Sequence, residues 1–393
     1  MAMTSPDASS TAALTQPILQ FGTSRFLQAH VDLFVSDALA RGDADAIGGI
    51  TVVQTTDNPD STARVAALSS GAGYPVKIRG IQNGQVIDTT QHCHAIREAA
   101  QATRDWARIC DAFCGPVRIV ISNTADRGFL LDERDDIAIV GDLDRVPHSF
   151  PAKLLVLLYA RWQRLPDAPL SIFPCELIEK NGDALRDVVT GLARTWHMPE
   201  DFVAYLDAQC VWVNSLVDRI VPEPLHPAGA IAEPYALWAV ERRPRMLMPC
   251  SHPSIVLTDD AEHYERLKLF LLNLGHTYLA ERWLRDRRAP DETVLDAMND
   301  AVLRAELEAL WRDEVLPVFD ALGKHDDAVA YLSTLRERFM NPLLVHKLAD
   351  IARNHEPKKQ RRFAPVVALA KTLGLAIEQP RLTMALADAT VAS

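Results

Sequence analysis

Short apolar runs that alternate with helical patterns are the feature that most constrains this 393-residue chain. Runs typical of buried strands occupy residues 17–22, 49–54, 117–122 and 170–173, and segments with helical periodicity lie between them. Strands that alternate with helices predict a parallel sheet that is covered by helices. We therefore expect an α/β fold in the first part of the chain.

The pattern changes after about Pro253, where strands give way to helices. Helical periodicity then recurs over four segments, at residues 262–284, 291–310, 326–339 and 342–352. A chain of this length suggests two domains. We expect a mobile tail over residues 1–16, an α/β domain over 17–255 and a mainly α-helical domain over 256–393.

Two local patterns refine the first domain. Asn83 and Gly84 stand between two strand-like runs, which predicts a β-hairpin with a tight turn. Residues 98–114 have a helical pattern, and the following Gly115 and Pro116 would end that helix.

The composition excludes several classes of protein. The formal net charge is −11 and no basic stripe stands out, which argues against a nucleic-acid partner. No apolar run is long enough for a transmembrane helix, and the N-terminus lacks the pattern of a secretory signal. Six cysteines in a chain this long do not suggest a disulfide scaffold, so a cytoplasmic location with reduced thiols is the default expectation. The His and Cys residues form no set typical of a tetrahedral metal site, and we expect no metal.

The turn after the first strand is a candidate nucleotide site. In a Rossmann-like fold, the backbone N–H groups of this turn approach a pyrophosphate at a helix N-terminus. Gly22 fits the first glycine of the usual G-x-G-x-x-G pattern, whereas Ser24 and Leu27 replace the other two. An ordinary strand-to-helix turn explains the segment equally well. The candidate cofactor-binding residues here are Gly22, Thr23, Ser24, Arg25 and Phe26.

Two later turns extend this candidate site. Asp57 follows the second strand, where an acid would bind the ribose 2′-hydroxyl, although a helix-capping role fits it equally well. No Arg or Lys follows Asp57 immediately, which favours NAD over NADP. Asn123 and Thr124 follow the strand at 117–122, at the sheet edge where ligands bind in open α/β sheets. A plain capped loop is the alternative for these two residues.

The segment 262–276 reads as one helix that is apolar nearly all round, with polar residues on one side. At about 100° per residue, Glu265 lies about 60°, His276 about 80° and Asn273 about 140° from Lys268. Burying a lysine, an amide and an imidazole together is unfavourable unless they are paired or used. A partly buried lysine can act as a base near neutral pH, but solvated surface positions for Lys268 and His276 are the ordinary alternative.

Five segments in this order resemble the long-chain mannitol dehydrogenase family, which includes the fructuronate and tagaturonate reductases. The resemblance extends over about residues 17–370, and the last segment is similar to the uronate-reductase branch. The segments are 21–30, 174–182, 214–222, the K-x4-N-x2-H pattern at Lys268, Asn273 and His276, and 338–342 with His346.

The resemblance implies zinc-independent hydride transfer. Lys268 would be the general base in alcohol oxidation and the general acid in ketone reduction. Asn273 would polarise the oxyanion, and His276 would hold a substrate hydroxyl or orient the lysine. Glu265 would gate proton exchange with water. Asp218 would line the same site, unless it forms a structural pair with the adjacent arginine.

One departure bears on the substrate. Mannitol-type enzymes carry Asn where this chain has Leu177, so a second oxyanion donor is missing unless Asn181 replaces it. The segment is closer to the tagaturonate-reductase type, whose sugar-acid substrate needs a cation for its carboxylate. We take Asn181, Arg338 and His346 as substrate-binding candidates. Solvated surface positions explain most of the candidate cations, which are Arg338, Lys347, Arg361 and Arg362.

The leading hypothesis is an NAD-dependent oxidoreductase that interconverts a keto-sugar acid, such as fructuronate or tagaturonate, with its aldonate. Oxidation of a polyol of mannitol or arabinitol type is the first alternative. A lyase that forms a Schiff base at Lys268, and a non-catalytic NAD-binding protein, are the others. The resemblance favours a monomer.

Overall fold

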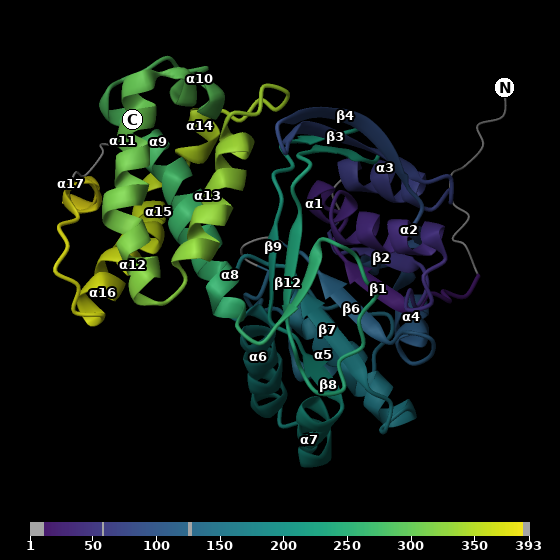
Figure 1. The fold of residues 1–393 in the computed structure, drawn as a ribbon. Coiled ribbons are helices and arrows are strands. Elements are labelled where there is room, and N and C mark those ends of the chain that lie inside the picture. The colour runs from purple at the N-terminus through teal and green to yellow at the C-terminus, as the bar shows by residue number, and fades with distance from the viewer. Residues whose placement is uncertain (1–11, 57–58, 125–127, 388–393) are drawn as a thin grey trace. The chain divides into compact units, whose positions relative to one another are not determined.

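The computed structural model describes residues 12–56, 59–124 and 128–387. The chain forms two compact units (Figure 1). The first contains residues 1–77, 90–231 and 236–261, and the second contains 78–89, 232–235 and 262–393. The second unit thus takes in two short segments, 78–89 and 232–235, from the range expected for the first domain, which the sequence pattern did not indicate.

A six-stranded parallel sheet forms the centre of the first unit, as the alternating pattern predicted (Figure 1). The two central strands, β1 and β6, pair in parallel, and the strand order β5-β2-β1-β6-β7-β8 reverses between them. This is the order of dinucleotide-binding Rossmann folds, so the predicted fold class is confirmed. The strands are β1 (Ile18–Phe21), β2 (Ile50–Gln54), β5 (Ile96–Gln101), β6 (Ile119–Ser122), β7 (Leu170–Pro174) and β8 (Cys210–Trp212).

Helices cover this sheet, which explains why its strands are buried and mostly apolar. Every residue of β1, β2, β6, β7 and β8 is buried, as expected for parallel strands with helices on both faces. The helices of this unit are α1 (Arg25–Gln28), α2 (Val31–Arg41), α3 (Pro59–Leu68), α4 (Ala102–Phe113), α5 (Phe150–Arg164), α6 (Asn181–Thr195) and α7 (Glu200–Ala208).

The helix expected over residues 98–114 is wrong in its first turn. Residues up to Gln101 belong to β5, which pairs with β2, and α4 begins only at Ala102. Glu98 is fixed in this strand because Thr51 Oγ1 donates to its carboxylate at 2.6 Å. Thr15 also donates to Glu98, and Leu14 is buried, so these two residues are packed although they lie in the range expected for the tail.

The predicted hairpin is confirmed. β3 (Tyr74–Gln82) and β4 (Gln85–Cys93) are joined by Asn83 and Gly84, whose φ angles of 54° and 73° are those of a type I′ turn. These strands extend a sheet of order β10-β11-β3-β4, with β10 (Glu223–Pro224) and β11 (Ala230–Ala232). A third sheet has the order β13-β12-β9 and consists of β9 (Ser215–Asp218), β12 (Leu237–Glu241) and β13 (Ile255–Thr258).

The second unit is mainly helical, as predicted. Its core is a continuous apolar cluster that includes Trp311, Phe319, Phe339 and Phe363. Its helices are α8 (Ala261–Leu267), α9 (Leu274–Arg285), α10 (Val294–Asn299), α11 (Ala301–Leu310), α12 (Leu316–Ala321), α13 (His325–Phe339), α14 (Leu348–Ile351), α15 (His355–Arg362), α16 (Ala364–Thr372) and α17 (Pro380–Ala387), with two π-helical turns, η2 (Lys268–Asn273) and η3 (Trp311–Val315).

Two of the predicted helices are shorter than the sequence suggested. The pattern at 291–310 is divided at Asp300, whose extended backbone and side chain cap α11. In the segment 342–352 only α14 is helical, because Lys347 instead forms an isolated β-bridge with Thr293.

Candidate functional site

The turn after β1 approaches the turn after β6 closely in the first unit. Gly22 has a φ of +108°, and a Cβ atom on it would lie 2.5 Å from the carbonyl oxygen of Asn123. Asn123 N donates to Phe21 O at 3.0 Å, and Ser24 Oγ donates to Asn123 Oδ1 at 3.2 Å. Only glycine fits this approach, at the point where the strand order reverses.

Ser24 has a defined role although it departs from the usual glycine pattern. Its Oγ accepts a hydrogen bond from Leu27 N at 3.2 Å and so caps the first helical turn. Arg64 Nη1 donates to both Thr23 O and Thr23 Oγ1 at 3.3 Å. The sequence patterns did not indicate Arg64, because it lies on α3 and meets Thr23 only in the fold.

The other candidate cofactor residues occupy different surroundings. Arg25 Nε donates to Val221 O at 3.0 Å, and the Phe26 ring stacks on His30 with 4.9 Å between ring centroids. Asp57 lies outside the described residues.

Asn123 and Thr124 are bound to the segment that follows β7. Asn123 Nδ2 donates to Cys175 O at 2.8 Å, and Thr124 donates to Glu176 Oε1 at 2.9 Å from both its N and its Oγ1. Ser122 Oγ donates to the other carboxylate oxygen of Glu176 at 3.0 Å. Burial raises the pKa of the Glu176 carboxyl, although these hydrogen bonds oppose the shift. Glu176 therefore fixes the loops at the carboxyl edge of the sheet.

Asn181, expected as a substrate-binding candidate, is held by backbone groups around it. Its Nδ2 lies within 3.1 Å of the carbonyl oxygens of Pro174, Glu176 and Ser215, and its Oδ1 accepts from Ser215 N at 2.9 Å. The amide is 1% exposed and fully engaged with backbone, so it has no donor left for an oxyanion.

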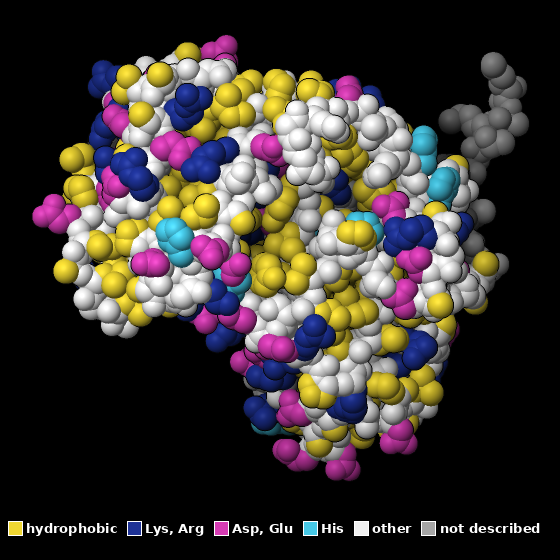
Figure 2. Space-filling view, viewed as in Figure 1, with side chains coloured by type: hydrophobic (Ala, Val, Ile, Leu, Met, Phe, Trp, Pro, Cys, Tyr) yellow, Lys and Arg dark blue, Asp and Glu magenta, His cyan; other side chains and the backbone are white. Residues whose placement is uncertain are grey.

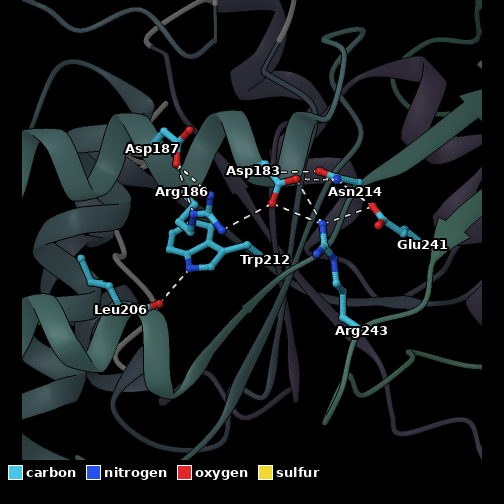
Figure 3. A network of polar contacts seen from close by, with 8 residues as sticks. All are labelled: Asp183, Arg186, Asp187, Leu206, Trp212, Asn214, Glu241 and Arg243. Atoms are coloured by element: carbon cyan, nitrogen blue, oxygen red, sulfur yellow. Dashed lines mark hydrogen bonds and ion pairs between the residues drawn. The ribbon is translucent and has the colours of Figure 1, made fainter. Parts of the chain in front are cut away.

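Polar contacts also join the start of α6 to the segment before β9 (Figure 3). Asn214 Nδ2 donates to Asp183 Oδ2 at 2.8 Å and to Glu241 Oε2 at 2.7 Å, and Arg243 bridges the same two carboxylates. This network fixes the start of β9, which ends at the buried Asp218. The segments 174–182 and 214–222 are thus one framework in space.

In the second unit, Lys268 and Asn273 are the first and last residues of the π-helical turn η2. Because π-helical hydrogen bonds join residues five apart, these two residues are about one turn apart and share a side. The α-helical geometry assumed from the sequence put Asn273 about 140° away, and this expectation was wrong. Single π-helical turns within α-helices are frequent at functional sites. Glu265 lies in α8 before this turn, and His276 lies in α9 after it.

Packing and hydrogen bonds hold η2 in place. Trp311, the first residue of η3, donates from its indole N–H to Leu271 O at 3.2 Å. A Cβ atom on Gly275 would lie 2.7 Å from the Trp311 ring, so this position requires a very small residue. On the other side, Arg362 Nη1 donates to Asn273 O at 3.3 Å and to Thr277 Oγ1 at 2.7 Å. Neither the π-helical turn nor these contacts were predicted from the sequence.

His276 is a neutral, buried imidazole. It stacks on Phe339 at 4.4 Å between ring centroids, and the His346 ring lies nearly perpendicular to it at 4.7 Å between centroids. Burial, reinforced by the field of His346, lowers the pKa of His276 well below its ordinary value. Within the described part of the chain, the buried Nε2 of His276 has no hydrogen-bond partner. Such an atom is available to a ligand.

Arg338 is already paired, in contrast to the carboxylate-binding role expected for it. Its Nη2 and Nε lie 2.8 and 2.9 Å from the two carboxylate oxygens of Glu233, and both side chains are almost fully buried. Its guanidinium also lies over the Tyr235 ring, 4.2 Å from the centroid. A substrate carboxylate at Arg338 would have to compete with this bidentate pair.

The burial of His346 predicts that the free energy of unfolding depends on pH. Burial lowers the pKa of His346 from 6.5 to about 4, so the unfolded chain binds more protons than the folded one between these values. Acidification therefore favours unfolding, and at about pH 5 the cost from this partly exposed histidine is at most about 2 kcal/mol. Urea unfolding at about pH 7.5 and about pH 5 measures the difference. The difference in the free energy of unfolding between the two pH values should shrink in His346→Gln and persist in the exposed control His92→Gln.

The described residues and the face drawn in Figure 2 show how charged and potential metal-ligating side chains are distributed. Charged side chains of both signs are interspersed on the face in Figure 2, without a basic patch. The described residues contain no cluster of three or more His, Cys, Asp or Glu side chains placed to hold a metal ion. Among the described helices none is both long and apolar enough to cross a membrane.

Comparison with known families decides the identity of the chain. Residues 16–248 match the mannitol dehydrogenase Rossmann domain, and residues 260–390 match the mannitol dehydrogenase C-terminal domain. The chain belongs to the mannitol dehydrogenase family. This member of the family is therefore an oxidoreductase, a dehydrogenase that acts on a secondary alcohol.

Relatives of this family member include altronate oxidoreductases, which support its place in the sugar-acid branch. That of Klebsiella pneumoniae subsp. pneumoniae is 31% identical over 395 residues, which cover 94% of this chain and 78% of the relative. The altronate oxidoreductase of Halalkalibacterium halodurans is 28% identical over 373 residues, which cover 90% of this chain and 70% of the relative.

Solved structures show the same fold. A substrate-free D-sorbitol dehydrogenase has a TM-score of 0.76 at 18% identity, over 95% of this chain and 80% of that one. Pseudomonas fluorescens mannitol 2-dehydrogenase, in a ternary complex with NAD and D-mannitol, has a TM-score of 0.74 at 18% identity. The match covers 95% of this chain and 78% of that one.

Proposed function

We propose that this protein is an NAD-dependent reductase of a keto-sugar acid of the tagaturonate or fructuronate type, which it interconverts with the aldonate. The observation that carries the proposal is the π-helical turn that starts at Lys268 and ends at Asn273, followed by a neutral His276. The altronate oxidoreductases among its relatives support a sugar acid as the substrate.

The residues of the first unit fit a dinucleotide. Gly22, Thr23 and Ser24 form a close turn at the reversal of the strand order, where dinucleotides bind in this fold. When bound, the nicotinamide supplies the hydride for reduction and accepts it in oxidation. Asp57 remains our candidate for the ribose hydroxyls, and Asn123 and Thr124 for the edge of the nicotinamide or the substrate.

The catalytic residues of the second unit have distinct roles in this proposal. In reduction, Lys268 Nζ gives its proton to the carbonyl oxygen as that oxygen gains negative charge, and in oxidation the neutral amine takes it back. Asn273 donates a hydrogen bond to the same oxygen. His276 holds a substrate hydroxyl through Nε2, and Glu265 exchanges the proton with water. Asp218, on β9 of the first unit, remains our further candidate.

A substrate panel tests this function. NADH oxidation is followed with tagaturonate, fructuronate, fructose and tagatose, and NAD reduction with altronate, mannitol and arabinitol. We expect turnover of the acids to exceed that of the neutral sugars. Preference for mannitol or arabinitol would favour the polyol alternative. Borohydride trapping of substrate on the protein would favour a lyase, and NADH binding without any turnover would favour a non-catalytic protein.

Substitution of Gly22 should weaken cofactor binding. Gly22→Ala forces a Cβ atom against Asn123 O and disfavours the positive φ, so the turn must open. We expect the Kd for NADH, measured by fluorescence titration, to rise at least about tenfold. Gly42→Ala is the matched control, because Gly42 also has a positive φ of +72° but open space around it. Equal effects of the two variants would contradict the proposed role of the turn.

A further inference from the structure

Arg362 occupies the end of α15 beside the proposed catalytic turn. Its Nη1 donates to Asn273 O at 3.3 Å and to Thr277 Oγ1 at 2.7 Å, which places the guanidinium within one turn of both Asn273 and His276. The side chain is partly buried. Within residues 12–56, 59–124 and 128–387, its Nε and Nη2 form no hydrogen bond, and the guanidinium has no carboxylate partner.

The other cations considered from the sequence differ from Arg362. Arg338 is neutralised by its bidentate pair with Glu233. Arg361 is exposed, and its Nε lies 3.4 Å from Pro357 O on its own helix. Lys347 is exposed as well. Of these four cations, Arg362 alone combines partial burial, contact with the catalytic turn and the lack of an acidic partner.

The surroundings of Arg362 suit an anion. Burial lowers its pKa to about 10, with a further contribution from Arg361, as expected for a partly buried cation without an acidic partner. His276 is neutral and can donate a hydrogen bond without adding a competing charge. Asp350, which acts on His346, is paired with Arg353 at 2.8 Å, and Glu281 on α9 is paired with His355 and Lys359. A bound carboxylate would therefore relieve an unfavourable buried charge.

We propose that Arg362 binds the carboxylate of the sugar acid through its Nε and Nη2 edge, and that it makes this protein prefer sugar acids over neutral sugars. The edge presents two parallel N–H groups, which match the two oxygens of a carboxylate. Because Nη1 holds the end of η2, the same guanidinium fixes the acid end of the substrate relative to Asn273. The inference rests on the proposed function, since it names the group that recognises its substrate class.

The test compares an acid with its neutral counterpart in matched variants. Calorimetric titration with altronate and with altritol, in the presence of NADH, measures binding, and tagaturonate and tagatose reduction measures KM and kcat. In Arg362→Gln we expect altronate binding to weaken about 30-fold or more, with the loss mainly in KM, and the neutral ligands to change less than about threefold. Arg362→Lys should recover part of the loss. Arg361→Gln, which removes the same charge from the adjacent exposed residue, should leave both ligands within about threefold.

The possible results separate this inference from the proposed function. If Arg362→Gln weakens the acid and the neutral ligands equally, Arg362 only supports the turn and the inference is wrong. The same holds if altronate binds the variant as tightly as the unmodified protein. If altronate binding depends on Arg362 but no keto acid is reduced, the recognition stands and the proposed reaction fails. If the unmodified protein neither binds altronate nor reduces a keto acid, both are overturned.

Discussion

Lys268→Ala is expected to lower kcat for keto-acid reduction by about 10²- to 10⁴-fold, the range that a positioned general acid contributes. The variant loses the group that gives its proton to the carbonyl oxygen. The Kd for NADH should remain within about twofold, because the dinucleotide turn belongs to the first unit. Stopped-flow measurement of NADH oxidation, together with fluorescence titration of NADH, checks both parts.

A control variant and the pH profile of kcat show whether the effect of Lys268→Ala comes from the loss of a catalytic group or only from the loss of a positive charge. Lys371→Ala removes an exposed lysine from the end of α16 and should leave kcat unchanged. The ionisation that controls kcat in the unmodified protein should disappear from the residual activity of Lys268→Ala. Near-normal turnover in Lys268→Ala would contradict the proposed mechanism.

The candidate catalytic residues come from the sequence and stay a proposal, but their helical geometry was not predictable from it. The spacing of Lys268 and Asn273 matched a family pattern, yet α-helical geometry put them about 140° apart around the helix axis. Between them stand four apolar residues, Leu269 to Leu272, so the segment has no polar stripe from which its helical period could be read. The contact that supports the π-helical turn comes from Trp311, which is 40 positions away in the chain. Local sequence therefore could not show the change of period.

Side chains with similar local patterns were harder to assign to roles. Arg338 and Arg362 are both cations in the last third of the chain, but only Arg338 has a buried acid, which lies 105 positions earlier at Glu233. The amide of Asn181 is engaged by Ser215, 34 positions later. The parallel sheet was predictable because the apolar strand pattern is local, whereas these pairings depend on the completed fold.

Glu233→Gln is expected to lower the free energy of unfolding by about 3–5 kcal/mol, because it leaves the buried Arg338 guanidinium without its charge partner. Urea unfolding checks this value. The matched control is Glu308→Gln, since Glu308 forms the same bidentate contact with Arg336 on α13, at 2.7 and 2.8 Å, but is 31% exposed. The control should lose less than about 1 kcal/mol, because solvent screens an exposed pair.

A double substitution decides whether Arg338 is structural or binds substrate. Glu233→Leu with Arg338→Met replaces both charges by apolar groups, and it should be more stable than Glu233→Gln because no buried charge is left unpaired. If Arg338 is structural, the double variant keeps the KM for tagaturonate within a few fold, in contrast to Arg362→Gln. The opposite outcome is that Glu233→Gln is as stable as the unmodified protein and that the double variant has a higher KM for the acid but not for the neutral sugar. That outcome would show that Arg338 binds the substrate carboxylate. A structural arginine therefore changes the free energy of unfolding but not the KM for tagaturonate, whereas a substrate-binding arginine changes that KM.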